Sequence, residues 1–167
     1  MSRLFGTDGV RGIANSELTP DLAYKLGFAG ARVLAVSSDI KPTLLIGMDT
    51  RISCNMLEAA LAAGICSAGA DVVLCGVLPT PAIAYLTSKY KYDAGVMISA
   101  SHNSYEYNGI KFFSGNGLKL SDEIEDEIER TVNEYDIYSK SRPVGEDVGT
   151  VIRRPESARQ YVEHLKR

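Results

Sequence analysis

The chain has 167 residues and a formal net charge of −3, and 45% of its residues are hydrophobic and 23% charged. These values are ordinary for a soluble globular protein of one compact domain, and they exclude a disordered or fibrous chain. Lysine and arginine are scattered rather than clustered, and no apolar stretch approaches the roughly 20 residues of a membrane span. We therefore expect no nucleic-acid partner, no membrane partner and a cytoplasmic location.

The amino-terminal half alternates between helical and extended hydrophobic periods, which is typical of an α/β domain. The predicted elements are, in order, a helix from Pro20 to about Val36, a strand over 43–47, a helix over 54–68 and a strand over 71–75. Thr19 and Pro20 suit the start of the first helix, and Ser53 suits the start of the second. Gly69 is a plausible terminator of the second helix. This half is therefore expected to form a strand–helix–strand unit.

The same alternation continues in the carboxyl-terminal half. The predicted elements are a helix over 80–89, a strand over 94–99, a strand over 109–114 with a turn over 115–117, a helix over 121–135 and a helix from 155. Helical crossovers between short buried strands favour parallel pairing. The expected fold class is α/β, with three α/β/α layers around a mostly parallel mixed sheet.

A domain boundary is expected near residue 140, because prolines and glycines interrupt the periodicity over 139–155. Residues 1–140 would form one domain, and residues 141–167 would be a linker and the start of a helix leading to a second domain. The amphipathic pattern is still running at Arg167, which predicts that the natural polypeptide continues.

Two sets of polar residues have structural interpretations. Asp122, Glu123 and Glu125 crowd the first turn of a predicted helix, where the helix dipole favours negative charge, so they are expected to be solvated and stabilising rather than catalytic. The cysteines form no Cys-x-x-Cys pair, and Cys54 and Cys66 would stand about 18 Å apart on a helix, so free thiols are expected.

The strongest candidate for a site is the loop Ser99–Ser104, which follows a buried strand and carries three hydroxyls, an imidazole and an amide. Sheets of this kind bind ligands at the carboxyl ends of their strands. The alternative is that the serine and asparagine side chains only form hydrogen bonds with backbone groups of the loop. A hydrolytic triad is disfavoured, because Ser101 lacks a Gly-x-Ser-x-Gly setting, His102 is badly placed to accept its proton, and His164 is expected to be an exposed bystander.

A second candidate is the amino-terminal segment Gly6-Thr7-Asp8-Gly9-Val10-Arg11-Gly12. Its glycines can turn backbone amides toward an anion, and Arg11 adds a planar fork of donors. The alternative is an ordinary turn with a surface arginine. Neither a dinucleotide fingerprint nor a nucleoside-triphosphate loop is present, so phosphate handling of another kind is indicated.

Five motifs, in this order, resemble the α-D-phosphohexomutases: Phe5 to Gly12, Gly47 to Ser53, Pro79-Thr80-Pro81, Ser99 to Asn103, and Asn108-Gly109-Ile110-Lys111. The resemblance extends from Arg3 to about Lys119. The segment from Arg3 to Gly12 is most similar to the branch of the family that acts on glucosamine phosphates.

The resemblance implies a phosphoserine mechanism. Ser101 would pass a phosphoryl group to a hexose phosphate and take one back from the other end of a hexose 1,6-bisphosphate, which serves as intermediate and activator. A Mg²⁺ ion would bind through a phosphate oxygen on Ser101, because the phosphoryl charge needs a cation for transfer. The implied reaction interconverts glucosamine 6-phosphate and glucosamine 1-phosphate, toward UDP-N-acetylglucosamine and cell-wall precursors.

The resemblance also assigns roles to residues around Ser101. Lys111 is the candidate general acid or base, Arg11 a charge stabiliser, and His102 a residue that shapes the phosphoserine turn. The implied substrate-binding residues are Thr7, Arg11, Asn103 and Lys111. Without the resemblance, Lys111 would be interpreted as a solvated strand lysine.

The chain departs from the family pattern in two places and lacks three of its parts. Ser104 replaces a proline that many relatives have after the Ser-His-Asn triplet, and Met48 replaces an arginine. The aspartate-rich magnesium loop, the sugar-recognition loop and the distal phosphate loop belong to later domains, so this chain alone is expected to be inactive. A homodimer through this domain is possible. The open alternatives are a phosphomannomutase or phosphoglucomutase, and a binding module without catalysis.

Overall fold

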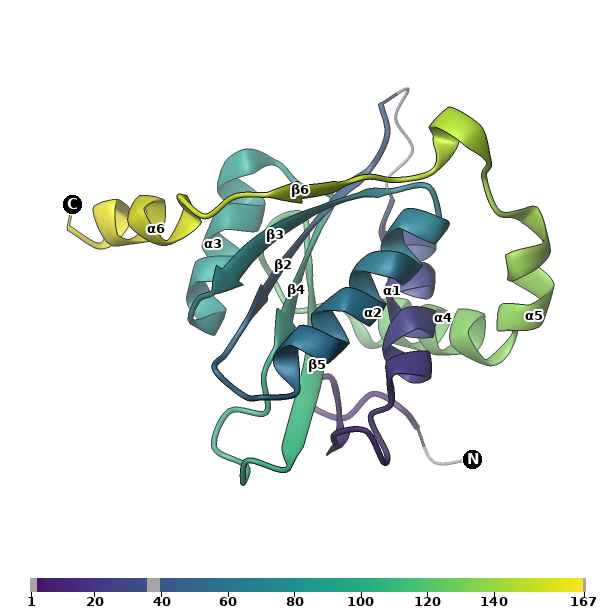
Figure 1. Cartoon of the computed structure of the whole chain (residues 1–167), viewed down its shortest axis with the longest axis horizontal. Helices are drawn as coiled ribbons and strands as arrows, with labels where there is room; N and C mark the ends of the chain where they lie inside the picture. Colours follow the sequence, from purple (N-terminus) through teal and green to yellow (C-terminus); the bar gives the residue numbers. More distant parts are fainter. Residues whose placement is uncertain (1–2, 36–39, 167) are drawn as a thin grey trace.

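The computed structural model describes residues 3–35 and 40–166, and within them a six-stranded sheet lies between two layers of helices (Figure 1). The elements are β1 (Val10–Ile13), α1 (Pro20–Leu34), β2 (Thr43–Met48), α2 (Cys54–Ser67), β3 (Asp71–Val77), α3 (Thr80–Tyr90), β4 (Ala94–Ile98), β5 (Tyr107–Ser114), α4 (Asp122–Asn133), α5 (Tyr135–Tyr138), β6 (Val151–Arg153) and α6 (Ser157–Leu165). The predicted α/β class is confirmed.

The strand order is β1-β5-β4-β2-β3-β6. Strands β4, β2, β3 and β6 pair in parallel, whereas β5 is antiparallel to both β4 and β1. The sheet is therefore mixed, as predicted, with its parallel part made by helical crossovers. The loop from β4 to β5 reverses the chain at the carboxyl edge of the parallel strands.

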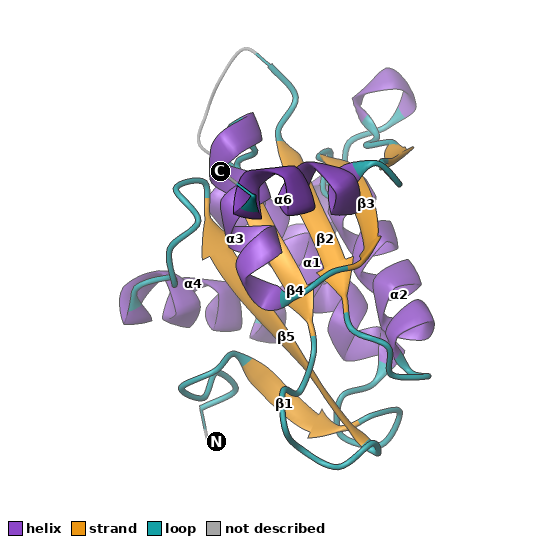
Figure 2. Ribbon diagram, turned by 90° about the vertical axis from the view of Figure 1, so that its left-hand side faces the viewer, coloured by secondary structure: helices purple, strands orange, loops and turns teal. Residues whose placement is uncertain are grey.

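The two helical layers enclose two separate cores. Figure 2 shows α3 and α6 in front of the sheet and α1, α2 and α4 behind it. Successive strand residues point to opposite faces, so Leu44 and Ile46 pack behind the sheet while Leu45 packs against α3 in front. Helices α1 and α2 pack on the sheet through buried side chains of the rear core, such as Leu26 and Leu57.

Helix ends agree with the sequence where a local signal exists. The backbone N–H of Leu22 donates to Thr19 Oγ1 (3.2 Å), which caps α1, and Gly69 follows α2 with a φ of +92°. The predicted end of the first helix near Val36 lies outside the described residues. Ser53 precedes α2 but makes no capping bond: its backbone is helical (φ −75°, ψ −9°) rather than extended, and its hydroxyl accepts a hydrogen bond from Asn108 Nδ2 (2.9 Å).

Two short edge strands were not predicted. Strand β6 lies within the stretch interpreted as a linker, where Val151–Arg153 pairs in parallel with β3. All three of its residues are exposed, so the strand leaves no hydrophobic period to recognise. Strand β1 is four residues long and contains a glycine. The chain beyond residue 140 therefore adds a strand to the same sheet.

The prediction that Glu125 is solvated is wrong. Its side chain is buried on α4, with Arg3 Nη2 3.7 Å from its carboxylate. The amino-terminal segment covers this turn of the helix, and the N–H of Leu4 donates to Glu129 Oε2 (2.9 Å). Burial raises the pKa of Glu125, and the positive charges of Lys119 and Arg3 oppose the rise.

The remaining structural expectations concern the cysteines, a histidine and the membrane. Cys54, Cys66 and Cys75 are free thiols, as expected. His164 is exposed, but its ring stacks on that of Tyr85 with 3.7 Å between ring centroids, so it packs α6 against α3. In the described part of the chain, no helix combines the length and the apolar character that a membrane crossing needs.

Candidate active site

Ser101 lies in the loop between β4 and β5 and is exposed. Its φ is +55°, a left-handed conformation that is uncommon for residues other than glycine. The backbone N–H of Ser101 donates to Ser99 Oγ (3.1 Å), which helps to hold this conformation. Uncommon backbone conformations persist where the surroundings enforce them, and they cluster at functional sites.

A cavity of about 270 Å³ opens beside this loop. Its lining residues come from the amino-terminal segment, α3, β4, the Ser101 loop and β5: Asp8, Arg11, Thr80, Met97, Ser99, Ser101 and Lys111. Four of the five motifs named above therefore contribute to this cavity, and the Gly47–Ser53 loop is not among its lining residues.

Strand register explains why the two cations of the cavity meet. Strand β5 lies between β1 and β4, with Arg11 opposite Gly109 and Lys111 opposite Met97. Residues of alternating position share a face of a sheet, and Met97 packs in the front core with α3. Arg11, Lys111 and Ser99 therefore converge on the front face, at the end of β4.

Two glycines give the space that this convergence requires. A Cβ on Gly109 would lie 2.6 Å from Ser99 O and 3.0 Å from Arg11 Cγ, so only glycine lets the arginine cross β5. Gly9 has a φ of +87°, and a Cβ there would collide with the Ile110 carbonyl. The glycines of the amino-terminal motif therefore serve a close backbone approach.

Among the described residues, Arg11 has a buried donor without a partner in the cavity wall. Its Nη1 donates to Asn103 Oδ1 (3.2 Å), and its Nη2 lies 3.5 Å from Asp8 Oδ2. Its Nε is buried and has no hydrogen-bond partner among the described residues. A buried donor without a partner is costly, and a guanidinium binds phosphate oxygens well. The cavity wall is therefore suited to an anion.

Lys111 and the start of α3 strengthen this charge pattern. Within the described chain Lys111 has no ion pair, and its Nζ lies 5.6 Å from the centre of the Phe113 ring. Thr80 is the first residue of α3, and the amino end of a helix favours negative charge. Two cations and a helix terminus thus face one carboxylate, Asp8.

The structure brings together only part of the predicted set. Ser101, Arg11 and Lys111 line one cavity, whereas Asn103 is outside the lining and accepts a hydrogen bond from Arg11. His102 is exposed outside the lining, with its Nδ1 3.5 Å from Ser101 Oγ. Thr7 is exposed and is also outside the lining.

The prediction of site residues missed Asp49 and Arg51, which lie under the Ser101 loop. Asp49 Oδ2 accepts hydrogen bonds from Ser99 Oγ (2.7 Å) and Arg51 Nε (3.0 Å). Burial alone would raise the pKa of Asp49, but hydrogen bonds from the Arg51 backbone, Ser99, Cys54 and the Arg51 side chain lower it below its usual value. A polar loop after a buried strand is the sequence signal for these residues.

The described residues do not by themselves form a metal site. Nowhere in residues 3–35 and 40–166 do three His, Cys, Asp or Glu side chains gather as metal ligands. A phosphate oxygen on Ser101 would be a single ligand, and Mg²⁺ binds protein through oxygen ligands in a near-octahedral shell.

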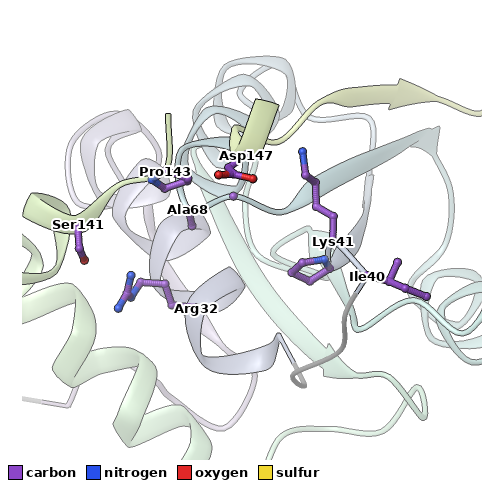
Figure 3. A pocket seen from close by; sticks show the side chains of 9 residues that line it. Arg32, Ile40, Lys41, Ala68, Ser141, Pro143 and Asp147 are labelled. Atoms are coloured by element: carbon purple, nitrogen blue, oxygen red, sulfur yellow. The ribbon is translucent and has the colours of Figure 1, made fainter. Parts of the chain in front are cut away.

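A larger cavity, of about 600 Å³, lies near the amino-terminal ends of β2 and β3, whereas the Ser101 loop follows the carboxyl end of β4 (Figure 3). Its cations already have partners. Lys41 Nζ donates to the carbonyls of Glu146 (2.7 Å) and Val148 (3.0 Å), and the Arg32 guanidinium lies 5.2 Å from the centre of the Tyr138 ring. The smaller cavity beside Ser101 is therefore the better candidate.

Residues 2–139 match the family model described as phosphoglucomutase/phosphomannomutase, alpha/beta/alpha domain I. The chain belongs to this family. It is 60% identical to the phosphoglucosamine mutase of Clostridium novyi and 58% identical to that of Ruminiclostridium cellulolyticum, each over 166 residues. These matches cover 99% of this chain but only 36% and 37% of the two relatives.

The fold agrees with a solved member of the family. A crystal structure of a phosphoglucomutase/phosphomannomutase family protein from Burkholderia thailandensis superposes with a TM-score of 0.81 at 26% identity. The match covers 99% of this chain and 35% of that protein. The sequence-based resemblance to the phosphohexomutases is confirmed, and the chain spans about a third of the length of the relatives it matches.

Proposed function

We propose that this chain is the phosphoryl-carrying part of a phosphoglucosamine mutase, which interconverts glucosamine 6-phosphate and glucosamine 1-phosphate. Two features support the proposal. Relatives of 58–60% identity over 99% of the chain bear that name, and Ser101 shares a cavity with Arg11 and Lys111. The single observation that carries it is the Ser101 hydroxyl, presented by a left-handed turn beside two cationic side chains.

The proposed reaction transfers one phosphoryl group in each of two steps. The sugar 1-hydroxyl attacks the phosphorus on Ser101, so a sugar O–P bond forms, the Ser101 Oγ–P bond breaks, and the hydroxyl proton passes to the amine form of Lys111. The product is glucosamine 1,6-bisphosphate. After the bisphosphate turns round, Ser101 Oγ attacks the 6-phosphoryl group, and Lys111 returns the proton to the departing sugar oxygen. The free bisphosphate would also act as activator by phosphorylating Ser101.

The surrounding residues would stabilise the charge that moves in these steps. Arg11 lines the cavity beside Ser101, and its guanidinium can bond a phosphoryl oxygen there. Asn103 orients Arg11 through its Oδ1. Roles for His102 in shaping the turn and for Thr7 in binding the substrate stay predictions.

Magnesium stays a prediction as well. A phosphate oxygen on Ser101 would be one ligand, and the other ligands would come from outside the described residues. The ion would neutralise charge on the phosphoryl group. Because this chain spans about a third of the length of its relatives, we propose that it is inactive alone. We also propose that the full enzyme is cytoplasmic and that a homodimer can form through this domain.

The test is a pair of variants in the full-length polypeptide. Ser101→Ala should abolish mutase activity and the phosphoryl group on the protein, because the carrier oxygen is gone. Ser88→Ala, an exposed serine of α3 far along the helix from the cavity, should retain both. Unchanged activity in Ser101→Ala would contradict catalysis at Ser101, whereas an unsubstituted polypeptide with neither mutase activity nor a phosphoryl group on Ser101 would favour the binding module.

Sugar preference is measured separately, because the cavity residues are suited to phosphate rather than to one sugar. The similarity to the Burkholderia thailandensis protein keeps phosphoglucomutase and phosphomannomutase as alternatives. The expected order of kcat/KM places glucosamine 6-phosphate above glucose 6-phosphate and mannose 6-phosphate. A higher value for mannose or glucose phosphate would replace the proposed sugar and leave the role of Ser101 intact.

A further inference from the structure

The Arg51 guanidinium uses all of its hydrogen-bond donors. An arginine carries five N–H donors in a fixed fork. Here they meet five acceptors: Asp49 Oδ2 from Nε (3.0 Å), the carbonyls of Ser104 (2.7 Å) and Tyr107 (3.0 Å) from Nη1, and the carbonyls of Ser101 (3.1 Å) and Asn103 (2.9 Å) from Nη2. The side chain is only 12% exposed. It is therefore fixed on every side and largely shielded from water.

Four of these acceptors belong to one segment, the Ser101 loop and the first residue of β5. Hydrogen bonds from a charged donor are stronger than neutral ones, so four of them to one short loop constrain its path. The bond to the Ser101 carbonyl acts on the residue whose φ is left-handed. Arg51 thus binds the loop without lining the cavity.

Asp49 joins this side chain to the other face of the same turn. Its Oδ2 accepts from Ser99 Oγ (2.7 Å), and Ser99 Oγ in turn accepts from the backbone N–H of Ser101 (3.1 Å). Its Oδ1 accepts from the Arg51 N–H (2.9 Å). The N–H and the carbonyl of Ser101 are therefore both tied to the loop that follows β2.

We propose that Arg51, oriented by Asp49, is a positioning residue that holds Ser101 in the geometry required for phosphoryl transfer. The inference rests on the proposed function, because it assigns a role in that same reaction. A displacement of about 1 Å at a reacting group can cost on the order of 100-fold in rate. Lysine cannot substitute, since its three donors leave from one atom and cannot reach four carbonyls and a carboxylate.

The experiment compares Arg51→Lys with Arg130→Lys in the full-length polypeptide. Arg130 is an exposed arginine of α4 whose one ion pair among the described residues is with Glu127, so it is a matched control. Arg51→Lys should lower kcat about 100-fold with KM for glucosamine 6-phosphate within about two-fold, because the loop moves but the substrate contacts stay. The phosphoryl group on Ser101 should still be detectable by mass spectrometry, and Arg130→Lys should match the unchanged enzyme.

A second variant covers the possibility that Arg51→Lys does not fold, which circular dichroism would reveal. Asp49→Asn has almost the same shape and should lower kcat about ten-fold with KM retained, because a neutral amide holds the guanidinium less strongly. An unchanged kcat in the folded variant, or a loss confined to KM, overturns the inference. If Ser101→Ala is inactive at the same time, the proposed function survives. If Ser101→Ala is active, the proposed function itself fails.

Discussion

The substitution Gly109→Ala tests the geometry of the candidate site most sharply. The new Cβ would stand 2.6 Å from Ser99 O and 3.0 Å from Arg11 Cγ. Neither neighbour can retreat freely, since the Ser99 N–H donates to the Gly109 carbonyl (2.9 Å) and Arg11 pairs with Gly109 across the sheet. Overpacking of this kind costs about 1–3 kcal/mol. For a domain of this size, that lowers the Tm by about 2–12 °C.

The assay is urea unfolding of the 167-residue chain followed by circular dichroism, with Gly6→Ala as the control. A Cβ on Gly6 would have its nearest neighbour, the Gly9 carbonyl, at an ordinary 3.6 Å. The control should therefore change the free energy of unfolding by no more than about 0.5 kcal/mol. Equal unfolding curves for the two variants would refute the claim that Gly109 is required by the crossing of Arg11.

Three further predictions concern titratable groups. The lowered pKa of Asp49 adds stability that is present above its unfolded pKa and is lost as pH falls through the folded value, so Asp49→Asn should flatten the acid side of the stability profile below about pH 4. Burial raises the pKa of Glu58, and the positive charge of Arg153 opposes the rise. The stability that comes from this raised pKa is present at low pH and is lost as pH rises through the folded pKa of Glu58. Glu58→Gln should therefore gain stability relative to the unchanged chain near pH 7 and lose that gain below about pH 4, as urea titrations would measure. Burial raises the pKa of Cys54 to about 11, so iodoacetamide at about pH 8 should alkylate the partly exposed Cys66 first, and faster labelling of native Cys54 would contradict its burial.

The regular part of the fold could be predicted because its signals are local. The cap at Thr19, the left-handed Gly69 and the alternation of buried strand residues each depend on a few neighbouring positions. The edge strands could not be predicted in this way. Val151–Arg153 is exposed throughout and is held by pairing with β3, which is distant in sequence. The burial of Glu125 depends likewise on Arg3, which comes from the opposite end of the domain.

The residues of the candidate site also differ in how far they could be predicted from local sequence. Ser101, Arg11 and Lys111 were indicated by motifs and by the family resemblance, and the structure places them around one cavity. Asp49 and Arg51 were missed because their partners lie about 50 positions later in the chain. Their role depends on β2 lying beside β4, a strand order that a pattern of hydrophobic residues does not specify.

Transfer of a labelled phosphoryl group tests the central claim most directly. The full-length polypeptide is incubated with glucosamine 1,6-bisphosphate labelled in its phosphoryl groups, freed of excess label, digested and mapped, and a second portion is chased with unlabelled glucosamine 6-phosphate. We predict label on the peptide that contains Ser101 and its loss to the sugar during the chase. Label on another residue, or label on Ser101 that the sugar phosphate cannot remove, would contradict the assignment of Ser101 as the phosphoryl carrier.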